Sequence, residues 1–315
     1  MRFSPDPTEL PKVPRPKTTV FTHTDDAGVT PSVSRAVADL WRAGILDGFS
    51  VIANGDGMAE LREAALSAPE RPLRLAVHLN LSEGQSSAPP ARVPLLVDDR
   101  GHLRHSFGSL LSFWIGGSPA RRRALVQQAA EEWRAQTARV TDGFAPRRLA
   151  SLDGHIHVHA LPFLFRVACE IALEFGVPGV RISREPLFLP PGRFFPPRSW
   201  WDNLPKHVVL RACSRLNEPT ANAAGLSHPD RIVGILSSGR MSAADALAGV
   251  SAAERGGAKV IEVVFHAGRE TGPPVSRWAN RADLERSYRS VGRQFEAEES
   301  ARLRETLIRR GYRSD

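Results

Sequence analysis

The sequence predicts an α/β barrel built from parallel strands. Between Thr18 and Leu79, short apolar runs alternate with amphipathic helical patterns at short spacing, an order that favours parallel pairing of the strands. Polar residues that can bind a metal or transfer a proton follow several of the apolar runs. Because barrel enzymes place their chemistry at the carboxyl ends of the strands, such residues would meet at one mouth of the barrel.

The expected strands and helices follow from local patterns. A strand is expected at 18–23, where Val20 and Phe21 form the apolar centre. A helix begins at Pro31, its apolar residues recur along one face, and Gly44 ends it. Similar patterns predict further strands at 48–53, 73–79, 149–152, 179–182 and 259–265, and further helices near 58–65, 119–140, 162–175, 242–254 and 282–310.

The N-terminus and two internal segments lack a regular pattern. Residues 1–17 hold five prolines and are predicted to form a mobile arm ahead of a single barrel domain at 18–315. Residues 84–112 are expected to be loop-rich. The segment at about 185–226 is expected to be an insertion without strong periodicity, and its aromatic content argues against disorder.

The composition is typical of a soluble globular protein, with 42% apolar and 24% charged residues. The formal net charge of +8 is compatible with an anionic partner, but a solvated basic surface is the commoner reason for such an excess. No zinc-finger or RNA-binding signature accompanies the arginines, so we expect no specific nucleic acid partner.

The cysteines and the apolar runs indicate the compartment. Cys169 and Cys213 lack the spacing of a metal or redox motif, so a disulfide framework is not expected. No apolar run is long enough to span a membrane, and the N-terminus has no secretory pattern. We therefore expect a cytoplasmic protein without a membrane span. The sequence leaves the oligomeric state open, a homodimer included.

Two adjacent carboxylates follow the first predicted strand. Asp25 and Asp26 would point in opposite directions in a regular strand, but a turn at this place would direct both into one cavity. One could then ligate a divalent metal while the other takes a proton from water. The alternative is an ordinary surface or helix-capping pair.

Single histidines follow two other predicted strands. His78 comes after the apolar run 75–77, and His266 comes after the apolar run 260–265. His266 suits the role of a general acid. The alternatives are a hydrogen-bonded core histidine for His78 and a solvated loop histidine for His266.

The segment Asp153–His159 carries three histidines at alternating positions. If it is extended, His155, His157 and His159 share one face, and neutral imidazole is a common ligand of divalent transition ions. Asp153 could ligate as well, or accept the hydrogen bond that fixes a histidine tautomer. The alternative is a histidine-rich surface turn. Together, the four segments indicate a metal site of one carboxylate and two imidazoles with open positions for water.

Four motifs in this order resemble those of the YdjC-type carbohydrate deacetylases, which include chito-oligosaccharide deacetylases. They are Thr24-Asp25-Asp26-Ala27-Gly28, Val77 to Gly84, Asp153 to His159, and Glu262 to Gly268. The resemblance extends from about residue 18 to 313. The chain departs from the family pattern at Ala27, Ile156 and Ala267, and none of these is an expected ligand.

The resemblance implies a distorted TIM-like barrel that hydrolyses the N-acetyl group of an amino sugar or glycoconjugate. It places the ligands of one divalent metal, magnesium or zinc, on Asp26, His78 and His155. It places the catalytic base on Asp25 and the acid on His266. Further residues expected to bind the N-acetylated sugar are Asn80, His157, Arg181, Trp200 and Trp201.

The aromatic residues of the insertion allow two interpretations. Phe194, Phe195, Trp200 and Trp201 offer flat apolar surface to a sugar ring, or they pack the insertion onto the barrel.

Two alternative functions remain open at this point. One is a metal-binding homologue without turnover, and the other is a metal-dependent hydrolase of a non-sugar amide or ester. Retention of Asp25 and His266, which a binding site alone would not need, favours the deacetylase.

Overall fold

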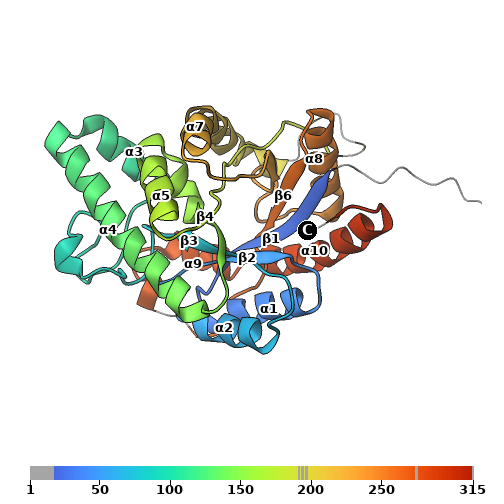
Figure 1. The fold of residues 1–315 in the computed structure, drawn as a ribbon, viewed down its shortest axis with the longest axis horizontal. Helices are drawn as coiled ribbons and strands as arrows, with labels where there is room; N and C mark the ends of the chain where they lie inside the picture. The colour runs from blue at the N-terminus through green and yellow to red at the C-terminus, as the bar shows by residue number, and fades with distance from the viewer. Residues whose placement is uncertain (1–17, 191, 193–194, 196–197, 274–275, 314–315) are drawn as a thin grey trace, which may run out of the picture.

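Six parallel strands form the centre of the computed structural model, in the order β4-β3-β2-β1-β6-β5, and curl into a half-barrel (Figure 1). Every neighbouring pair is parallel, which confirms the predicted fold class. The strands are β1 (Thr19–Ala27), β2 (Gly48–Val51), β3 (Arg74–Leu79), β4 (Leu149–Gly154), β5 (Arg231–Val233) and β6 (Val260–Phe265). The structure describes residues 18–190, 192, 195, 198–273 and 276–313, so the arm expected at 1–17 lies outside it.

Residues 179–184 lie between the two edge strands. Arg181 N donates to the Leu152 carbonyl of β4 at 2.9 Å, and Ile232 N of β5 donates to the Arg184 carbonyl at 3.0 Å. The strand expected at 179–182 is wrong as a regular strand, since only isolated bridges form. Arg184 N donates to the Ile182 carbonyl, and this tight turn ends the pairing. The barrel is therefore distorted at this position.

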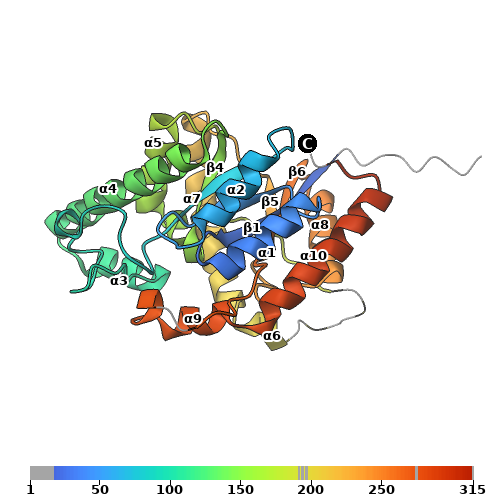
Figure 2. The same cartoon turned by 90° about the horizontal axis from the view of Figure 1, so that it is seen from below.

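The helices surround the curled sheet (Figures 1 and 2). Helix pairs that pack side by side include α1 with α2, α4 with α5, and α8 with α10. Thr30 caps α1 by accepting from Val33 N at 3.4 Å, and Trp41 lies on its buried face. The helices of the three pairs are α1 (Pro31–Arg42), α2 (Met58–Ser67), α4 (Pro119–Phe144), α5 (Pro162–Glu174), α8 (Ala243–Arg255) and α10 (Val291–Arg309).

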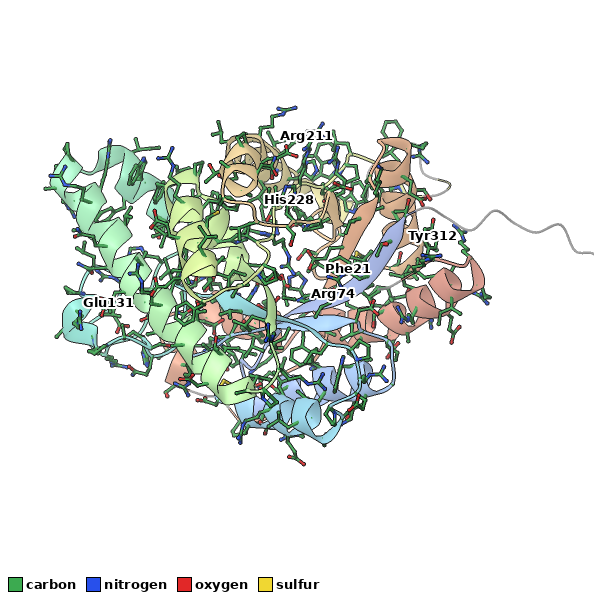
Figure 3. The ribbon with its side chains drawn as sticks, viewed as in Figure 1. Phe21, Arg74, Glu131, Arg211, His228 and Tyr312 are labelled. Carbon is green, nitrogen blue, oxygen red and sulfur yellow. The ribbon has the colours of Figure 1, made fainter. Side chains whose placement is uncertain are left out.

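Most of the hydrophobic core lies in a large and a smaller cluster, beside a third cluster of four buried residues. The large cluster packs α1, α2, α4 and α5 against β2, β3 and β4, with Trp41, Phe49 and Trp133 fully buried. The smaller cluster packs α8 and α10 against β6. Near the amino-terminal ends of β1 and β3, the Arg74 guanidinium lies over the Phe21 ring, 4.2 Å from its centroid (Figure 3).

The two segments expected to be irregular contain helices. Residues 84–112 lead into α3 (Phe107–Gly116), and the insertion at 185–226 holds α6 (Arg198–Trp201) and α7 (Leu204–Ala223). The apolar pattern did not predict α7, because the buried face of this helix is partly polar. His207, Ser214 and Asn217 are among its buried residues. The short strand β5 was not predicted, and the single helix expected at 282–310 is divided into α9 (Ala282–Tyr288) and α10.

The remaining whole-chain expectations concern the cysteines and membrane spans. Cys169 and Cys213 are both buried and unpaired, as expected. Among the described residues, no helix is both long and apolar enough to cross a membrane.

The two tryptophans of α6 are in different environments, so they give a matched pair of substitutions. Trp200 is 4% exposed, and its Nε1–H donates to Ser237 Oγ at 3.1 Å, whereas Trp201 is 60% exposed. Trp200→Ala is expected to lower the free energy of unfolding by about 3–5 kcal/mol because it leaves a cavity. Trp201→Ala is expected to change it by about 0.5 kcal/mol or less. Urea unfolding of both variants measures the difference, and equal losses would contradict this placement.

Candidate metal centre

A bulge at the end of β1 directs both aspartates into one cavity. The pairing of β1 with β2 shifts between Thr24 and Ala27, and Asp26 has a φ of 63°. Left-handed backbone is uncommon for a residue other than glycine and costs about 1–3 kcal/mol, so the surrounding structure must stabilise it. The irregularity overcomes the alternation of side chains that a regular strand would impose. Both Asp25 and Asp26 line the cavity described below.

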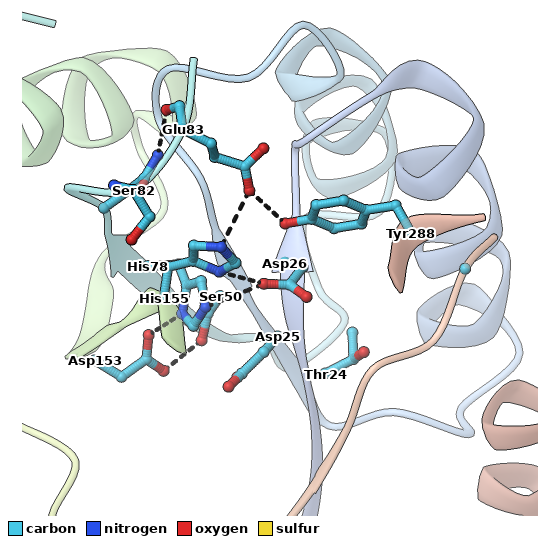
Figure 4. Close-up of polar contacts among 12 residues, drawn as sticks. Thr24, Asp25, Asp26, Ser50, His78, Ser82, Glu83, Asp153, His155 and Tyr288 are labelled. Carbon is cyan, nitrogen blue, oxygen red and sulfur yellow. Dashed lines mark hydrogen bonds and ion pairs between the residues drawn. The ribbon is translucent and has the colours of Figure 1, made fainter. Parts of the chain in front are cut away.

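The register of β3 and β4 pairs His78 with Asp153. His78 Nδ1 lies 2.6 Å from Asp153 Oδ1, and Ser50 Oγ donates to Asp153 Oδ2 at 2.5 Å. A carboxylate only accepts, so His78 carries a proton on Nδ1. Its Nε2 faces Asp26 Oδ1 at 3.3 Å (Figure 4).

The segment after β4 turns instead of remaining extended. His155–Ala160 form the 3₁₀ helix η2, in which Ile156 and His157 have φ values of 45° and 61°. The histidines therefore do not share one face. His155 Nδ1 lies 2.8 Å from Asp26 Oδ1, while His157 contacts Ser183 and His159 contacts the Arg181 carbonyl.

Asp26, His78 and His155 offer three ligand atoms that lie within 4.8 Å of one another. Donors bound to one ion at about 2.1 Å lie about 3.0–3.4 Å apart, close to the 2.8 and 3.3 Å observed here. Each imidazole also has its other nitrogen beside a buried carboxylate, an arrangement usual for metal-binding histidines. The structure thus brings the three predicted ligands together, and their donors fit a divalent ion.

Glu83 is the carboxylate beside His155, and this role was not predicted from the sequence. Glu83 Oε1 lies 3.1 Å from His155 Nε2 and accepts from the Tyr288 hydroxyl at 2.7 Å (Figure 4). Its Oε2 accepts from Arg277 Nε at 3.2 Å and from Trp278 Nε1. Its partners lie about two hundred positions along the chain, so no local pattern points to them.

Arg293 holds the second oxygen of Asp26. Both of its terminal nitrogens donate to Asp26 Oδ2 at 3.0 Å, and its Nε donates to the Gly268 carbonyl. Asp26 Oδ1 is left to face the two imidazoles. Despite burial, the charge of His155, together with that of Arg293, holds the pKa of Asp26 well below its usual range.

A second group of possible metal ligands lies beside the first, and the Arg181 guanidinium already pairs with it. His23, Asp25 and Asp153 also place ligand atoms within 4.8 Å. Arg181, however, donates from Nη1 to both oxygens of Asp25 at 2.8 Å and lies 2.8 Å from Asp153 through Nη2. It also contacts both oxygens of Glu262. Arg181 is 2% exposed, and all its described charged partners are protein carboxylates.

A cavity of about 470 Å³ opens onto the three ligands. His266 lines it because Thr24 pairs with Phe265, which makes Asp25 and His266 the next positions on adjacent strands. The other lining residues that can contact a polar ligand include His157, Lys206, Tyr288, Arg293 and the serines 238, 287 and 290.

Lys206 was not predicted, and it comes from α7 of the insertion. Burial lowers the pKa of both Lys206 and His157. The insertion therefore does reach the cavity through a lysine, and none of its described aromatic residues lines the cavity.

The other expected sugar contacts lie away from this cavity. Asn80 is buried and donates to Asn54 Oδ1 and to the Glu83 carbonyl, both at 2.9 Å. Trp200 and Trp201 line a separate apolar pocket of about 380 Å³ with leucines 187, 189 and 204 and Phe188. Phe195 is 81% exposed, and Phe194 lies outside the described residues.

The sequence profile described as YdjC-like protein matches residues 19–309. The chain belongs to the YdjC-like family. Proteins named carbohydrate deacetylase from Mus musculus and Homo sapiens are each 28% identical to it, over 82% and 83% of this chain and 81% and 78% of theirs. A solved structure from Enterococcus faecalis V583, described as a cellobiose-phosphate cleavage protein, superposes with a TM-score of 0.65 at 19% identity, covering 95% of this chain and 97% of that one. It has the same fold.

Two buried groups predict how stability depends on pH in the metal-free protein. Burial opposes charge on both, but hydrogen bonding by His155 and the charge of Arg277 lower the pKa of Glu83 to about 2, and nearby aspartates raise the pKa of His78 to about 10. Glu83 therefore stabilises the fold fully above its ordinary pKa of 4.5, and this is lost as the pH falls towards 2. His78 stabilises it fully below 6.5, and this is lost as the pH rises through about 10.

We expect the metal-free protein to be most stable between pH 4.5 and 6.5. Urea unfolding across a pH series in EDTA measures this, and a maximum at alkaline pH would contradict it. Saturating divalent metal should move the maximum upward, because metal and protons compete for the imidazoles.

Proposed function

We propose that this protein is a metal-dependent deacetylase that hydrolyses the N-acetyl group of an amino sugar or glycoconjugate. The observation that carries the proposal is the convergence of Asp26, His78 and His155 at one cavity that Asp25 and His266 also line. Relatives of the chain that are named carbohydrate deacetylase supply the substrate class.

The three ligands would hold one divalent ion. Two imidazoles and one carboxylate suit zinc better than magnesium, which prefers oxygen donors. When bound, the ion would supply the Lewis acidity that polarises the acetyl carbonyl and makes water more acidic.

Asp25 is proposed as the general base that takes a proton from the attacking water. It lies next to Asp26 in the chain and lines the same cavity. The two hydrogen bonds from Arg181 fix the orientation of its carboxylate, so the group is held ready without a change of rotamer. Each carboxylate oxygen accepts one of these hydrogen bonds and keeps a second lone pair that can accept a proton.

His266 is proposed as the acid that protonates the leaving amine. Its side chain is partly exposed, and its backbone N–H donates to the buried Glu296 at 2.7 Å. Its Nδ1 lies 3.7 Å from the same carboxylate. That position leaves Nε2 available to the substrate, on the adjacent strand to Asp25.

The decisive experiment measures product release from a set of candidate substrates. The protein loaded with zinc or magnesium is incubated with N-acetylglucosamine, its oligomers, other N-acetyl sugars, a non-sugar acetamide and an aryl acetate. Equal amounts of free amine and acetate from a sugar, lost on chelation, would support the proposal. Metal binding without turnover would favour a binding homologue, and cleavage of the non-sugar compounds alone would favour the other hydrolase.

The role of Asp25 predicts the behaviour of Asp25→Asn. The amide cannot accept the proton, so kcat should fall by about 10²–10⁴-fold. Metal content, measured by elemental analysis, should stay at the wild-type level because Asp25 is not an expected ligand. Near-normal turnover in a metal-loaded variant would reassign Asp25 to a structural role.

The role of His266 predicts a change in the pH–rate profile. In the wild type the rate should fall as the pH rises past the pKa of the protonated acid. His266→Ala should lower kcat and remove that alkaline fall while metal affinity stays nearly unchanged. His228→Ala is the control, since His228 contacts Asn222 away from the metal cavity. An unchanged profile in His266→Ala would point to another cavity group, such as His157.

A further inference from the structure

We propose that Glu83 is a positioning residue that decides which nitrogen of His155 is presented to the metal. The inference rests on the metal site of the proposed function, and it assigns a role to a residue outside the ligand set. Glu83 is fully buried and does not line the cavity, so it acts through His155 and not on the substrate.

The first step is the proton on His155. Glu83 Oε1 lies 3.1 Å from His155 Nε2 and accepts a hydrogen bond from Tyr288. An ionised carboxylate has no proton to donate, so this close contact is favourable only when His155 Nε2 carries the N–H, although the direction of that N–H is not that of a regular hydrogen bond. The lone pair of a neutral imidazole is then on Nδ1, the atom that lies 2.8 Å from Asp26 Oδ1.

The second step is the rigidity of the carboxylate. Glu83 Oε2 accepts from Arg277 Nε and from the indole N–H of Trp278, so both oxygens are held by donors. Three hydrogen-bond donors, on Tyr288, Arg277 and Trp278, hold this buried group in a single orientation. Glu83→Gln cannot reproduce this, because its NH₂ group would either face the Arg277 and Trp278 donors or turn toward His155 and replace the acceptor there by a donor.

The third step joins Glu83 to Asp26 through the C-terminal part of the chain. Tyr288, which donates to Glu83, lies under the Arg293 guanidinium at 4.6 Å from the ring centroid. Arg293 in turn holds Asp26 Oδ2. The end of α9 and the start of α10 therefore fix two of the three ligands, His155 and Asp26, through Tyr288 and Arg293 in the wall of the cavity.

His78 also has a buried carboxylate beside the ring nitrogen that does not face Asp26, but this carboxylate is positioned differently. Its partner Asp153 is provided by strand register, whereas the partner of His155 comes from a loop and is fixed by residues near the C-terminus. The two histidines consequently present different nitrogens, Nε2 from His78 and Nδ1 from His155, to the same oxygen of Asp26.

The test compares zinc affinity in three full-length proteins by competition with a chromogenic chelator. Glu83→Gln is expected to bind zinc about 10–100-fold more weakly than the wild type, as is typical when the partner of a metal-binding histidine is lost. Glu132→Gln is the matched control: Glu132 is another fully buried glutamate, and it accepts from Ser87 N and Ala88 N, away from the ligands. Its zinc affinity should stay at the wild-type value.

The outcomes separate the inference from the proposed function. A folded Glu83→Gln protein with wild-type zinc affinity would overturn the role of Glu83 and leave the deacetylase proposal intact. A wild-type protein that binds no divalent metal would overturn the proposed function itself.

A measurement on the wild type covers the case in which Glu83→Gln does not fold. Cadmium is bound to protein with isotope-labelled histidines, and cadmium–nitrogen scalar couplings are read by NMR. We expect coupling to Nδ1 of His155 and to Nε2 of His78. Coupling to Nε2 of His155 would overturn the inference.

Discussion

The buried guanidinium of Arg181 is the contact on which the site and the closing of the barrel both depend. It binds carboxylates from three strands, Asp25 of β1, Asp153 of β4 and Glu262 of β6, from a segment that bridges the two edge strands. Removing charges from water costs several kcal/mol per ion, and only close pairing offsets that cost. Each charge in this group therefore requires the others.

This dependence connects the shape of the barrel to the chemistry. Asp153 contacts Arg181 with one oxygen and His78 with the other, so the group that neutralises the cation also fixes the tautomer of a ligand. Asp25 contacts the same guanidinium and lies next to Asp26. A lysine at 181 would keep the charge but lose the planar fork that reaches several carboxylates at once.

The sequence predicted the parts of the site that follow local rules. Apolar runs marked β1, β3, β4 and β6, and the residues just beyond them, such as His78 and His266, meet at one cavity. It did not predict Glu83, Arg293 or Lys206, because their roles come from contacts between distant loops and helices. The left-handed backbone at Asp26 could not be predicted from local sequence patterns either, because tertiary contacts of the Asp26 side chain stabilise it.

The balance of buried charge gives an independent reason to expect a dication at the three ligands. Five buried carboxylates contact the ligands or Arg181, and three guanidiniums pair with them, so the group carries a net charge of −2 before the histidines are counted (3 − 5). Protonation of both ligand imidazoles would neutralise it, which agrees with the raised pKa of each. A divalent ion with two neutral imidazoles would neutralise it equally, and would replace two protons by one doubly charged ion in contact with Asp26. The members of this group are Asp25, Asp26, Glu83, Asp153 and Glu262 with Arg181, Arg277 and Arg293.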